Sequence, residues 1–310
     1  MTYNELISKL ESVDLDQCFP IYVPSHLRPN WYTYRNIISN LPKGFRKNKV
    51  HYIVRDEMYK EYKAAQPDVD IIVIPKEYEY PGYGLDTTRK FLYDYALSNG
   101  DRYIFDFDDD INYFSACYGH DKNTRRLRAE DRKKYLHNIL TLASVTSAEL
   151  MEKYEKLCFG TFDVISPSTC TKDYHKLKAI TNIGQIPRQA LIIDLQKMKN
   201  MGIERSGSYD RMGEDQGVVH NVLLHGGWTF CLPTLIRNVV QADDEKNKRT
   251  ECILFNTDSN GLCEGFENVL ISNGVDLKYT SKLKDGHYWG VNWRALRKDH
   301  PEFEKIIEEW

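Results

Sequence analysis

Four aspartates crowd the end of one apolar segment, Arg102–Tyr113, which reads RYIFDFDDDINY. The apolar residues predict a strand, in which Asp is disfavoured, so this concentration of charge needs a reason. On an extended segment, side chains two residues apart point the same way, which groups Asp106, Asp108 and Asp110 and turns Asp109 away. Two carboxylates on one side can bind Mg²⁺ or Mn²⁺ together with phosphate oxygens. The alternative is that these residues only shape a turn or cap a helix.

The segments around the aspartates predict the fold that positions them. Strands are predicted at 18–25, 49–56, 70–77 and 102–110, and helices at 2–13, 31–41, 57–66 and 84–100. This alternation is typical of βαβ units in an α/β fold, with a mostly parallel sheet covered by helices on both faces. Ligands of such sheets bind beyond the carboxyl ends of strands, which is where the aspartates lie.

The pattern is less regular in the second part of the sequence. Helices are predicted at 135–157, 195–202 and 213–227, and strands at 164–169, 188–194 and 228–236. The polar stretch 241–262 is predicted to be a loop. No repeat, low-complexity segment or linker divides the chain, so we expect one domain over residues 1–310.

The composition is that of an ordinary globular protein. The net charge of −3 argues against coating nucleic acid by bulk electrostatics, but it leaves room for one local basic face. The seven cysteines include no C-x-x-C pair, which favours a reduced, cytoplasmic setting. The polar N-terminal stretch predicts no signal peptide, and no apolar run is long enough to predict a membrane span.

The segment YIFDFDDDI resembles the D-x-D segment of GT-A glycosyltransferases. The resemblance implies a GT-A-like fold with a mixed, mostly parallel sheet. It also implies a divalent metal, Mn²⁺ or Mg²⁺, held between aspartates and the diphosphate of a nucleotide sugar. Asp108 and Asp110 would bind the metal, and Asp108 and Asp109 would contact the donor. The residues alone leave the separate roles of Asp106 and Asp109 open.

Three further segments resemble GT-A motifs in the matching order. They read IYVPSHLRP at 21–29, YGLDTTRKFLYDYA at 83–96 and GEDQGVVHNVLLHGG at 213–227. The first implies that Pro24, Ser25 and Arg28 meet the nucleotide, and the second implies that Arg89 approaches it. Lys90 stands where the motif usually has Asn. Each arginine could instead be a surface residue with a simple salt bridge or a solvated head.

The third of these segments implies a catalytic base. Asp215 is the first choice and Glu214 the second, since a carboxylate near the acceptor hydroxyl can accept its proton. Such a base implies inversion at the anomeric carbon. The alternative is that these acids only favour the first turn of a helix through its dipole. In similar enzymes a histidine near the C-terminus often completes the metal site, which implies His287 here, while His225 lies at a predicted helix end.

The opening loop, the helix of Arg89 and the DDDI ending are more specifically similar to the phage TET/JBP-associated glycosyltransferases, over about 20–240. That family decorates hydroxymethylated pyrimidines in DNA. The resemblance implies transfer from a UDP-sugar to 5-hydroxymethylcytosine, in the cytoplasm of a phage-infected bacterium. It divides the chain into a nucleotide-sugar half at about 18–120, an acceptor half at about 121–240 and a tail at 241–310.

A DNA acceptor would need a basic surface and a flipped-out base. The stretch 122–134 follows the aspartate strand and holds seven basic and two acidic residues. Further basic residues predicted to join this surface are Lys172, Lys176, Lys178, Lys282, Lys284, Arg294, Arg297 and Lys298. Aromatic residues predicted to stack on the base or fill its gap are Tyr113, Tyr118, Trp289 and Trp293. The alternative is that the charge run is only a solvated helix face.

Three other functions remain compatible with the residues. The same chemistry could serve a polysaccharide, lipid-sugar or protein acceptor, although the sequence has no amphipathic tail that would favour a lipid. A nucleotidyltransferase shares paired carboxylates on a similar sheet, but it would carry a glycine-rich basic loop, which VPSHLRPN lacks. A non-enzymatic DNA-binding module is disfavoured by the acidic net charge and by the aspartate cluster.

Overall fold

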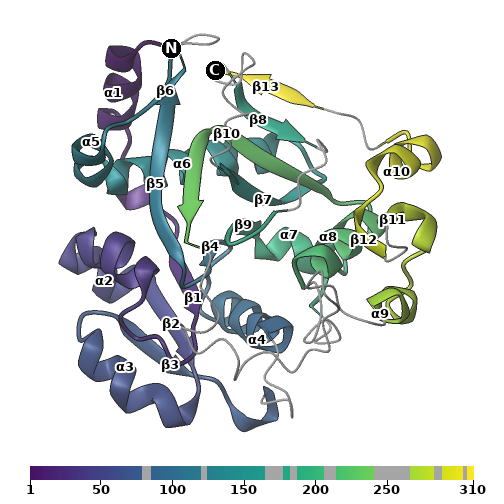
Figure 1. Ribbon diagram of the computed structural model, residues 1–310, viewed down its shortest axis with the longest axis horizontal. Helices are drawn as coiled ribbons and strands as arrows, with labels where there is room; N and C mark the ends of the chain where they lie inside the picture. Colours follow the sequence, from purple (N-terminus) through teal and green to yellow (C-terminus); the bar gives the residue numbers. More distant parts are fainter. Residues whose placement is uncertain are drawn as a thin grey trace.

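The computed structural model describes residues 1–78, 85–119, 124–164, 177–181, 187–205, 214–240, 266–282, 288–302 and 306–310. Within them, one sheet has the strand order β13-β8-β10-β7-β9-β4-β1-β2-β3, and β5 joins it by pairing with β10 and with β6. Helices cover both faces of the sheet (Figure 1). Parallel and antiparallel pairs both occur, which confirms the predicted α/β class with a mixed sheet.

The N-terminal part of the sheet is parallel, as the alternation of elements predicted. Its strands are β1 (Ile21–Pro24), β2 (Val50–Val54), β3 (Asp70–Val73) and β4 (Tyr103–Phe107). The intervening helices are α2 (Lys43–Lys49), α3 (Tyr59–Ala65) and α4 (Leu85–Ser98). Every residue of β1 and β2 is buried, because helices cover this part of the sheet on both sides.

The remaining strands give the sheet its mixed character. They are β5 (Ile111–Tyr118), β6 (Arg125–Arg126), β7 (Leu157–Val164), β8 (Leu177–Thr181), β9 (Ala190–Asp194), β10 (Trp228–Val239) and β13 (Ile307–Glu309). β9 is antiparallel to both β4 and β7, and β7 is parallel to β10. The strands β4, β7 and β10 therefore run in one direction, and their carboxyl ends share one edge of the sheet.

Alternate residues of β4 face two separate hydrophobic layers. Phe105 and Phe107 pack in the layer that contains α1 (Tyr3–Glu11) and α6 (Leu136–Lys153). Ile104 packs in the other layer, which also contains α4 and parts of three further helices. These are α7 (Leu195–Asn200), α8 (Glu214–Leu224) and α10 (Trp293–Asp299). Asp106 shares the side of Ile104, so its carboxylate faces α4.

The shorter elements lie outside these layers or at their borders. They are α5 (Ala129–Lys134), α9 (Phe266–Ser272) and the pair β11 (Thr280–Lys282) and β12 (Tyr288–Val291). The predicted strand at 164–169 lies almost entirely outside the described residues, as does the whole predicted loop at 241–262. Within the described residues, no helix combines the length and apolarity needed to cross a bilayer.

The structure differs from the prediction directly around the aspartates. β4 ends at Phe107 and the chain turns at Asp109 and Asp110, so the alternation argument that paired Asp108 with Asp110 does not apply there. A strand that was not predicted, β5, begins at once at Ile111. The predicted helix at 31–41 is instead a π-helical turn, η2 (Thr33–Ile37), followed by the 3₁₀ turn η3 (Ile38–Asn40).

Candidate active site

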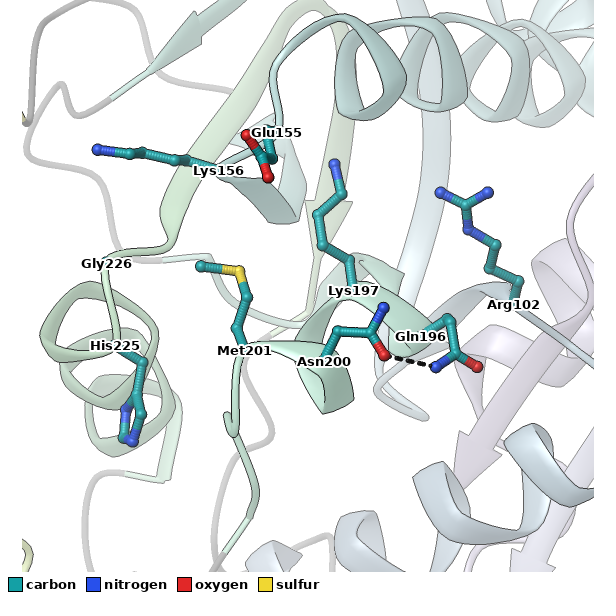
Figure 2. Close-up of a pocket in the computed structure, with 9 residues that line it drawn as sticks. All are labelled: Arg102, Glu155, Lys156, Gln196, Lys197, Asn200, Met201, His225 and Gly226. Atoms are coloured by element: carbon teal, nitrogen blue, oxygen red, sulfur yellow. Dashed lines mark hydrogen bonds between the residues drawn. The ribbon is translucent and has the colours of Figure 1, made fainter.

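A cavity of about 720 Å³ lies at the amino ends of β4, β7 and β10. Arg102 precedes β4, Lys156 precedes β7 and Gly226 lies just before β10, and Figure 2 shows these residues around the cavity. His225 also lines it, and its Nδ1 lies 2.9 Å from the carbonyl oxygen of Asn221. The aspartates lie at the opposite, carboxyl edge of these strands, so this cavity is not the predicted site.

Thr33, from η2, holds the turn formed by the aspartates. Its hydroxyl donates to the carbonyl oxygen of Asp108 at 2.6 Å and accepts the backbone N–H of Ile111 at 2.9 Å. Its own backbone N–H donates to the carbonyl oxygen of Asp109 at 3.0 Å. One buried threonine therefore fixes the exit from β4 and the entry to β5.

Two more backbone contacts fix the turn from the other part of the sheet. The N–H of Asp108 donates to the carbonyl oxygen of Gln189 at 2.7 Å, and the N–H of Val240 donates to that of Asp110 at 3.2 Å. Gln189 has a φ of 60°, an uncommon value for a residue other than glycine. Segments just before β9 and just after β10 thus determine where the aspartate carboxylates can go.

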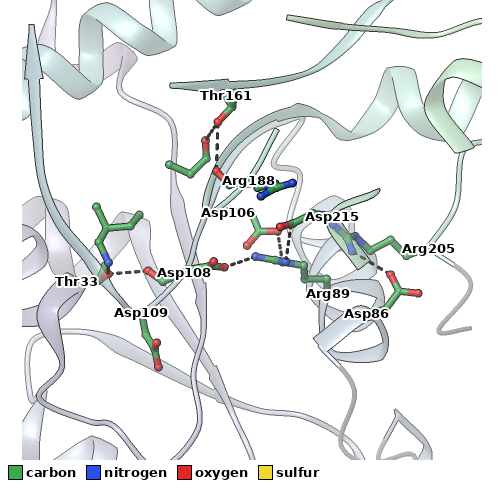
Figure 3. Close-up of polar contacts among 12 residues, drawn as sticks. Thr33, Asp86, Arg89, Asp106, Asp108, Asp109, Thr161, Arg188, Arg205 and Asp215 are labelled. Carbon is green, nitrogen blue, oxygen red and sulfur yellow. Dashed lines mark hydrogen bonds and ion pairs between the residues drawn. The ribbon is translucent and has the colours of Figure 1, made fainter. Parts of the chain in front are cut away.

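Arg89 of α4 is the centre of a cluster of carboxylates (Figure 3). Its Nε lies 2.9 Å from Asp106 Oδ2, its Nη2 lies 2.5 Å from Asp108 Oδ1, and its Nη1 lies 3.8 Å from Asp215 Oδ1. The Arg89 side chain is fully buried, and so is that of Asp106. Burying a charge is unfavourable unless other charges compensate it, and here three carboxylates do. Arg89, which was predicted to approach the nucleotide, therefore lies beneath the carboxylates in this structure.

A second buried group continues this network along α4. The Tyr93 hydroxyl donates to Asp106 Oδ2 at 3.1 Å and accepts from Arg205 Nη2 at 3.2 Å. Arg205 Nη1 lies 2.9 Å from Asp86 Oδ1. Burial raises the pKa of Tyr93 far above its ordinary value, so its hydroxyl keeps its proton and remains a donor. The network connects the buried face of α4 to β4 through Asp106 and to the segment after α7 through Arg205.

Asp109 points away from this cluster, as expected, although it lies in a turn and not in the strand that the alternation argument assumed (Figure 3). Its Oδ2 accepts from the Ser25 hydroxyl at 2.8 Å, and its Oδ1 lies 3.0 Å from Arg28 Nη1. Tyr62 of α3 also joins the group, because its hydroxyl lies 2.7 Å from that of Ser25. The structure thus brings together three predicted nucleotide-binding residues, and Pro24 ends β1 directly before Ser25.

Asp108 and Asp215 expose 24% and 23% of their side chains, whereas Arg89 between them exposes none. Both carboxylates therefore meet the guanidinium on one side and solvent on the other. The buried guanidinium of Arg237, on β10, also interacts electrostatically with these two carboxylates. Burial lowers the pKa of Arg237, and the negative charges of neighbours that include Asp108 and Asp215 oppose that shift.

The donor set of the aspartate turn fits a hard divalent cation, since Asp108 and Asp110 offer carboxylate oxygens. Within the described residues, no group of three or more His, Cys, Asp and Glu side chains could hold a metal by itself. A cation here would therefore take further oxygens from the diphosphate of a donor. His287 lies outside the described residues, and Glu214 is placed only as the first residue of α8.

The structure does not bring the predicted phosphate-binding residues together. α5 holds part of the basic stretch and α10 carries Arg294, Arg297 and Lys298, and these helices lie on opposite sides of the molecule (Figure 1). Trp293 is buried in the core. Among the other predicted members, Lys172, Lys176 and Lys284 lie outside the described residues, and nothing is described of the Trp289 side chain.

The sequence reasoning missed several polar residues of the site, namely Thr33, Tyr62, Asp86, Tyr93, Arg205 and Arg237. One available signal was the spacing of Asp86, Arg89 and Tyr93, which places three polar side chains on one helix face. That face should be apolar if it packs on a sheet, so a polar stripe there indicates a buried network. Thr33 and Arg205 gave no such local signal.

Comparison with family models shows that the chain is a glycosyltransferase. Residues 19–182 match the model of the TET-Associated Glycosyltransferase family, which is more than half of the 310 residues. The chain belongs to this family, which confirms the resemblance seen in its motifs. The match includes Arg28, Arg89 and the aspartate turn, whereas Asp215 lies beyond it. No curated protein matches the chain.

Several solved structures share a distant overall likeness with the chain. Glucosyl-3-phosphoglycerate synthase from Mycobacterium tuberculosis, in complex with Mn²⁺, uridine-diphosphate-glucose and phosphoglyceric acid, has 8% identity and a TM-score of 0.44, covering 94% of this chain and 92% of that chain. Its complex with Mg²⁺ and uridine-diphosphate has 8% identity and a TM-score of 0.43, with coverages of 94% and 93%. A mycobacterial protein has 8% identity and a TM-score of 0.43, with coverages of 100% and 88%.

Proposed function

We propose that this glycosyltransferase moves a sugar from a UDP-sugar to a hydroxymethylated pyrimidine in DNA, with 5-hydroxymethylcytosine as the first base to test. The observation that carries the proposal is that Asp108 and Asp215 flank one buried arginine and both reach solvent at the carboxyl edge of the sheet. They supply one carboxylate for a donor and one for an acceptor. The family of the chain supports the choice of a DNA base. The setting we propose is the cytoplasm of a phage-infected bacterium.

On the donor side, Asp108 and Asp110 would hold Mg²⁺ or Mn²⁺ together with diphosphate oxygens. When bound, such an ion neutralises the negative charge that develops on the leaving diphosphate. Ser25, Arg28 and Asp109 form a group of hydrogen bonds and one ion pair beside the turn, and they are suited to hold the nucleoside. The Arg28 side chain is 15% exposed, so part of its guanidinium is accessible to a ligand.

On the acceptor side, Asp215 would accept the hydroxyl proton of the hydroxymethyl group. The hydroxyl oxygen would attack the anomeric carbon at the same time. The bond from that carbon to the diphosphate breaks as the new bond forms, so the configuration inverts. Glu214 is the second candidate for this base. Arg89 does not touch the reacting atoms, and its role is to position Asp108 and Asp215.

The test is an assay of base modification with defined DNA. The protein is incubated with Mn²⁺, a panel of UDP-sugars, and duplexes that contain cytosine, 5-methylcytosine, 5-hydroxymethylcytosine or 5-hydroxymethyluracil. The DNA is digested and its nucleosides are analysed by mass spectrometry, while UDP release is followed in parallel. We expect a sugar-sized mass gain on the hydroxymethylated nucleoside alone, with stoichiometric UDP.

Each other result has a definite meaning. UDP release with no mass gain on any DNA would overturn the choice of acceptor while keeping a UDP-sugar donor. A mass gain on 5-hydroxymethyluracil but not on 5-hydroxymethylcytosine would change only the base. Neither UDP release nor a mass gain with any sugar would overturn the proposal as a whole.

A further inference from the structure

Tyr113, on β5, is held by two arginines from different elements. Arg126 of β6 donates from Nη1 to the Tyr113 hydroxyl at 3.1 Å. The guanidinium carbon of Arg132, on α5, lies 3.7 Å from the centroid of the same ring. The strand pair explains the first contact, because Arg126 is in register with Cys117, whose side chain shares the face of Tyr113. The result is a partly exposed aromatic ring with a stacked cation.

Nearby acids neutralise only part of the positive charge around Tyr113. The described stretch 124–134 holds six basic residues, Arg125, Arg126, Arg128, Arg132, Lys133 and Lys134, against Glu130 and Asp131, a formal charge of six minus two, or +4. None of the ion pairs among the described residues includes any of the six. Asp131 interacts with the Tyr3 hydroxyl and, like Glu11, also acts on Lys134. A solvated helix face usually mixes both signs of charge, so this segment is unusually free to meet an anion.

Tyr113 is also close to the candidate active site along the chain. β5 leaves the aspartate turn at Ile111, and Tyr113 lies three residues beyond Asp110. At about 3.3 Å per residue, the Cα atom of Tyr113 is about 10 Å from that of Asp110. Successive phosphates of one DNA strand rise about 3.4 Å along a duplex, so this distance spans about three nucleotides.

We propose that Tyr113, Arg126 and Arg132 form the binding surface for the DNA strand that flanks the acceptor base. The arginines would bind phosphates, and the ring of Tyr113 with the Arg132 guanidinium would offer a flat surface on which a neighbouring base stacks. This inference rests on the proposed function, because it requires a DNA acceptor. It replaces the predicted surface that spanned α5 and α10 with one confined to β5, β6 and α5.

The test compares two double variants that remove the same charge. R126A/R132A removes the two cations that contact Tyr113, and K60A/K199A removes two exposed lysines, one on α3 and one on α7. Binding of a fluorescent duplex with one 5-hydroxymethylcytosine is measured at several salt concentrations. We expect the slope of log K against log salt to become shallower by about 1.8 in R126A/R132A, since each lost phosphate contact changes it by about 0.9. K60A/K199A should keep the wild-type slope.

A second comparison separates stacking from charge and from folding. Y113A should weaken duplex binding by about fivefold to a hundredfold with the salt slope kept, because stacking on an aromatic ring carries no net charge. In each variant, kcat/KM for the duplex is divided by kcat/KM for free 5-hydroxymethyldeoxycytidine, so a general loss of fold cancels from the ratio. We expect this ratio to fall in R126A/R132A and in Y113A.

The outcomes separate this inference from the proposed function. If the wild-type protein glycosylates DNA but R126A/R132A keeps both the slope and the ratio, the DNA strand binds elsewhere and this inference is wrong. If the wild-type protein transfers sugar to the free nucleoside and neither binds nor modifies DNA, the acceptor is not DNA and both fail.

Discussion

Asp108 and Asp215 share one counterion, the buried guanidinium of Arg89. Asp108 follows the end of β4, and Asp215 lies in the first turn of α8, so the two come from distant parts of the chain. A planar guanidinium presents its nitrogens in fixed directions, so the position of one carboxylate restricts that of the other. The proposed donor and acceptor groups are thus set relative to one another before any substrate binds.

Replacing Asp110 by Asn should remove metal-dependent turnover and leave the fold intact. The amide keeps the size of the side chain but loses the charge that a hard cation needs. We expect kcat to fall by about 10²- to 10³-fold, as measured by UDP release across a Mn²⁺ titration. D56N, at an exposed position in the turn after β2, is the matched control and should behave like the wild type. Full activity in D110N would remove Asp110 from the metal site.

Replacing Asp215 by Asn should slow sugar transfer while the donor still binds. Loss of a general base lowers rates by about 10²- to 10⁴-fold. Transfer to 5-hydroxymethylcytosine DNA is compared with UDP-sugar affinity from calorimetry, and the anomeric configuration of the wild-type product is read by NMR. An inverted product together with a slow D215N variant fits the assignment. A retained configuration, or a fast D215N variant, contradicts it, and E214Q would then be the next test.

Replacing Arg89 by Met should strongly destabilise the protein, because Asp106 would remain buried without its counterion. Breaking such a pair typically lowers the free energy of unfolding by about 3–5 kcal/mol. Urea denaturation of R89M, D106N and R89M/D106N gives the coupling between the two residues. We expect the double variant to be more stable than the sum of the single losses predicts. Additive losses would show that the two side chains do not act as a pair.

His26, in the loop after β1, should make stability depend on pH. Burial, with the positive charge of Arg55 as the next largest cause, lowers the His26 pKa to about 4 from its usual 6.5. Between these values the unfolded chain binds the proton more readily than the folded chain, so stability falls as pH drops from 6.5 towards 4. H26Q should lose less stability than the wild type between pH 7 and pH 4.5 in urea denaturation. Equal losses would contradict the lowered pKa.

The sequence predicted the parallel part of the fold well, because β1, β2 and β4 are short apolar runs between clear helices. It missed β5, since INYFSACY mixes polar and apolar residues and its burial depends on pairing with β10. At the site, Asp109 points away from its neighbours as expected, but it lies in a turn, so strand alternation does not account for its direction. Local patterns did not predict that Arg89 would be buried, because a helical pattern shows which residues share a face but not what packs against it.

The pairing of β5 with β10 has a consequence for the order in which the chain folds. The strands β1, β2 and β3 pair with their neighbours in sequence, so they can form while the chain is still being made. β5 ends at Tyr118, far before β10 begins at Trp228, and contacts between residues so distant in sequence form slowly. Val240, whose N–H donates to the carbonyl oxygen of Asp110, comes still later in the sequence. We therefore expect the aspartate turn to be among the last parts of the structure to form. A chain that ends before β10 would then have the loop of Arg28 but not the final conformation of the aspartate turn.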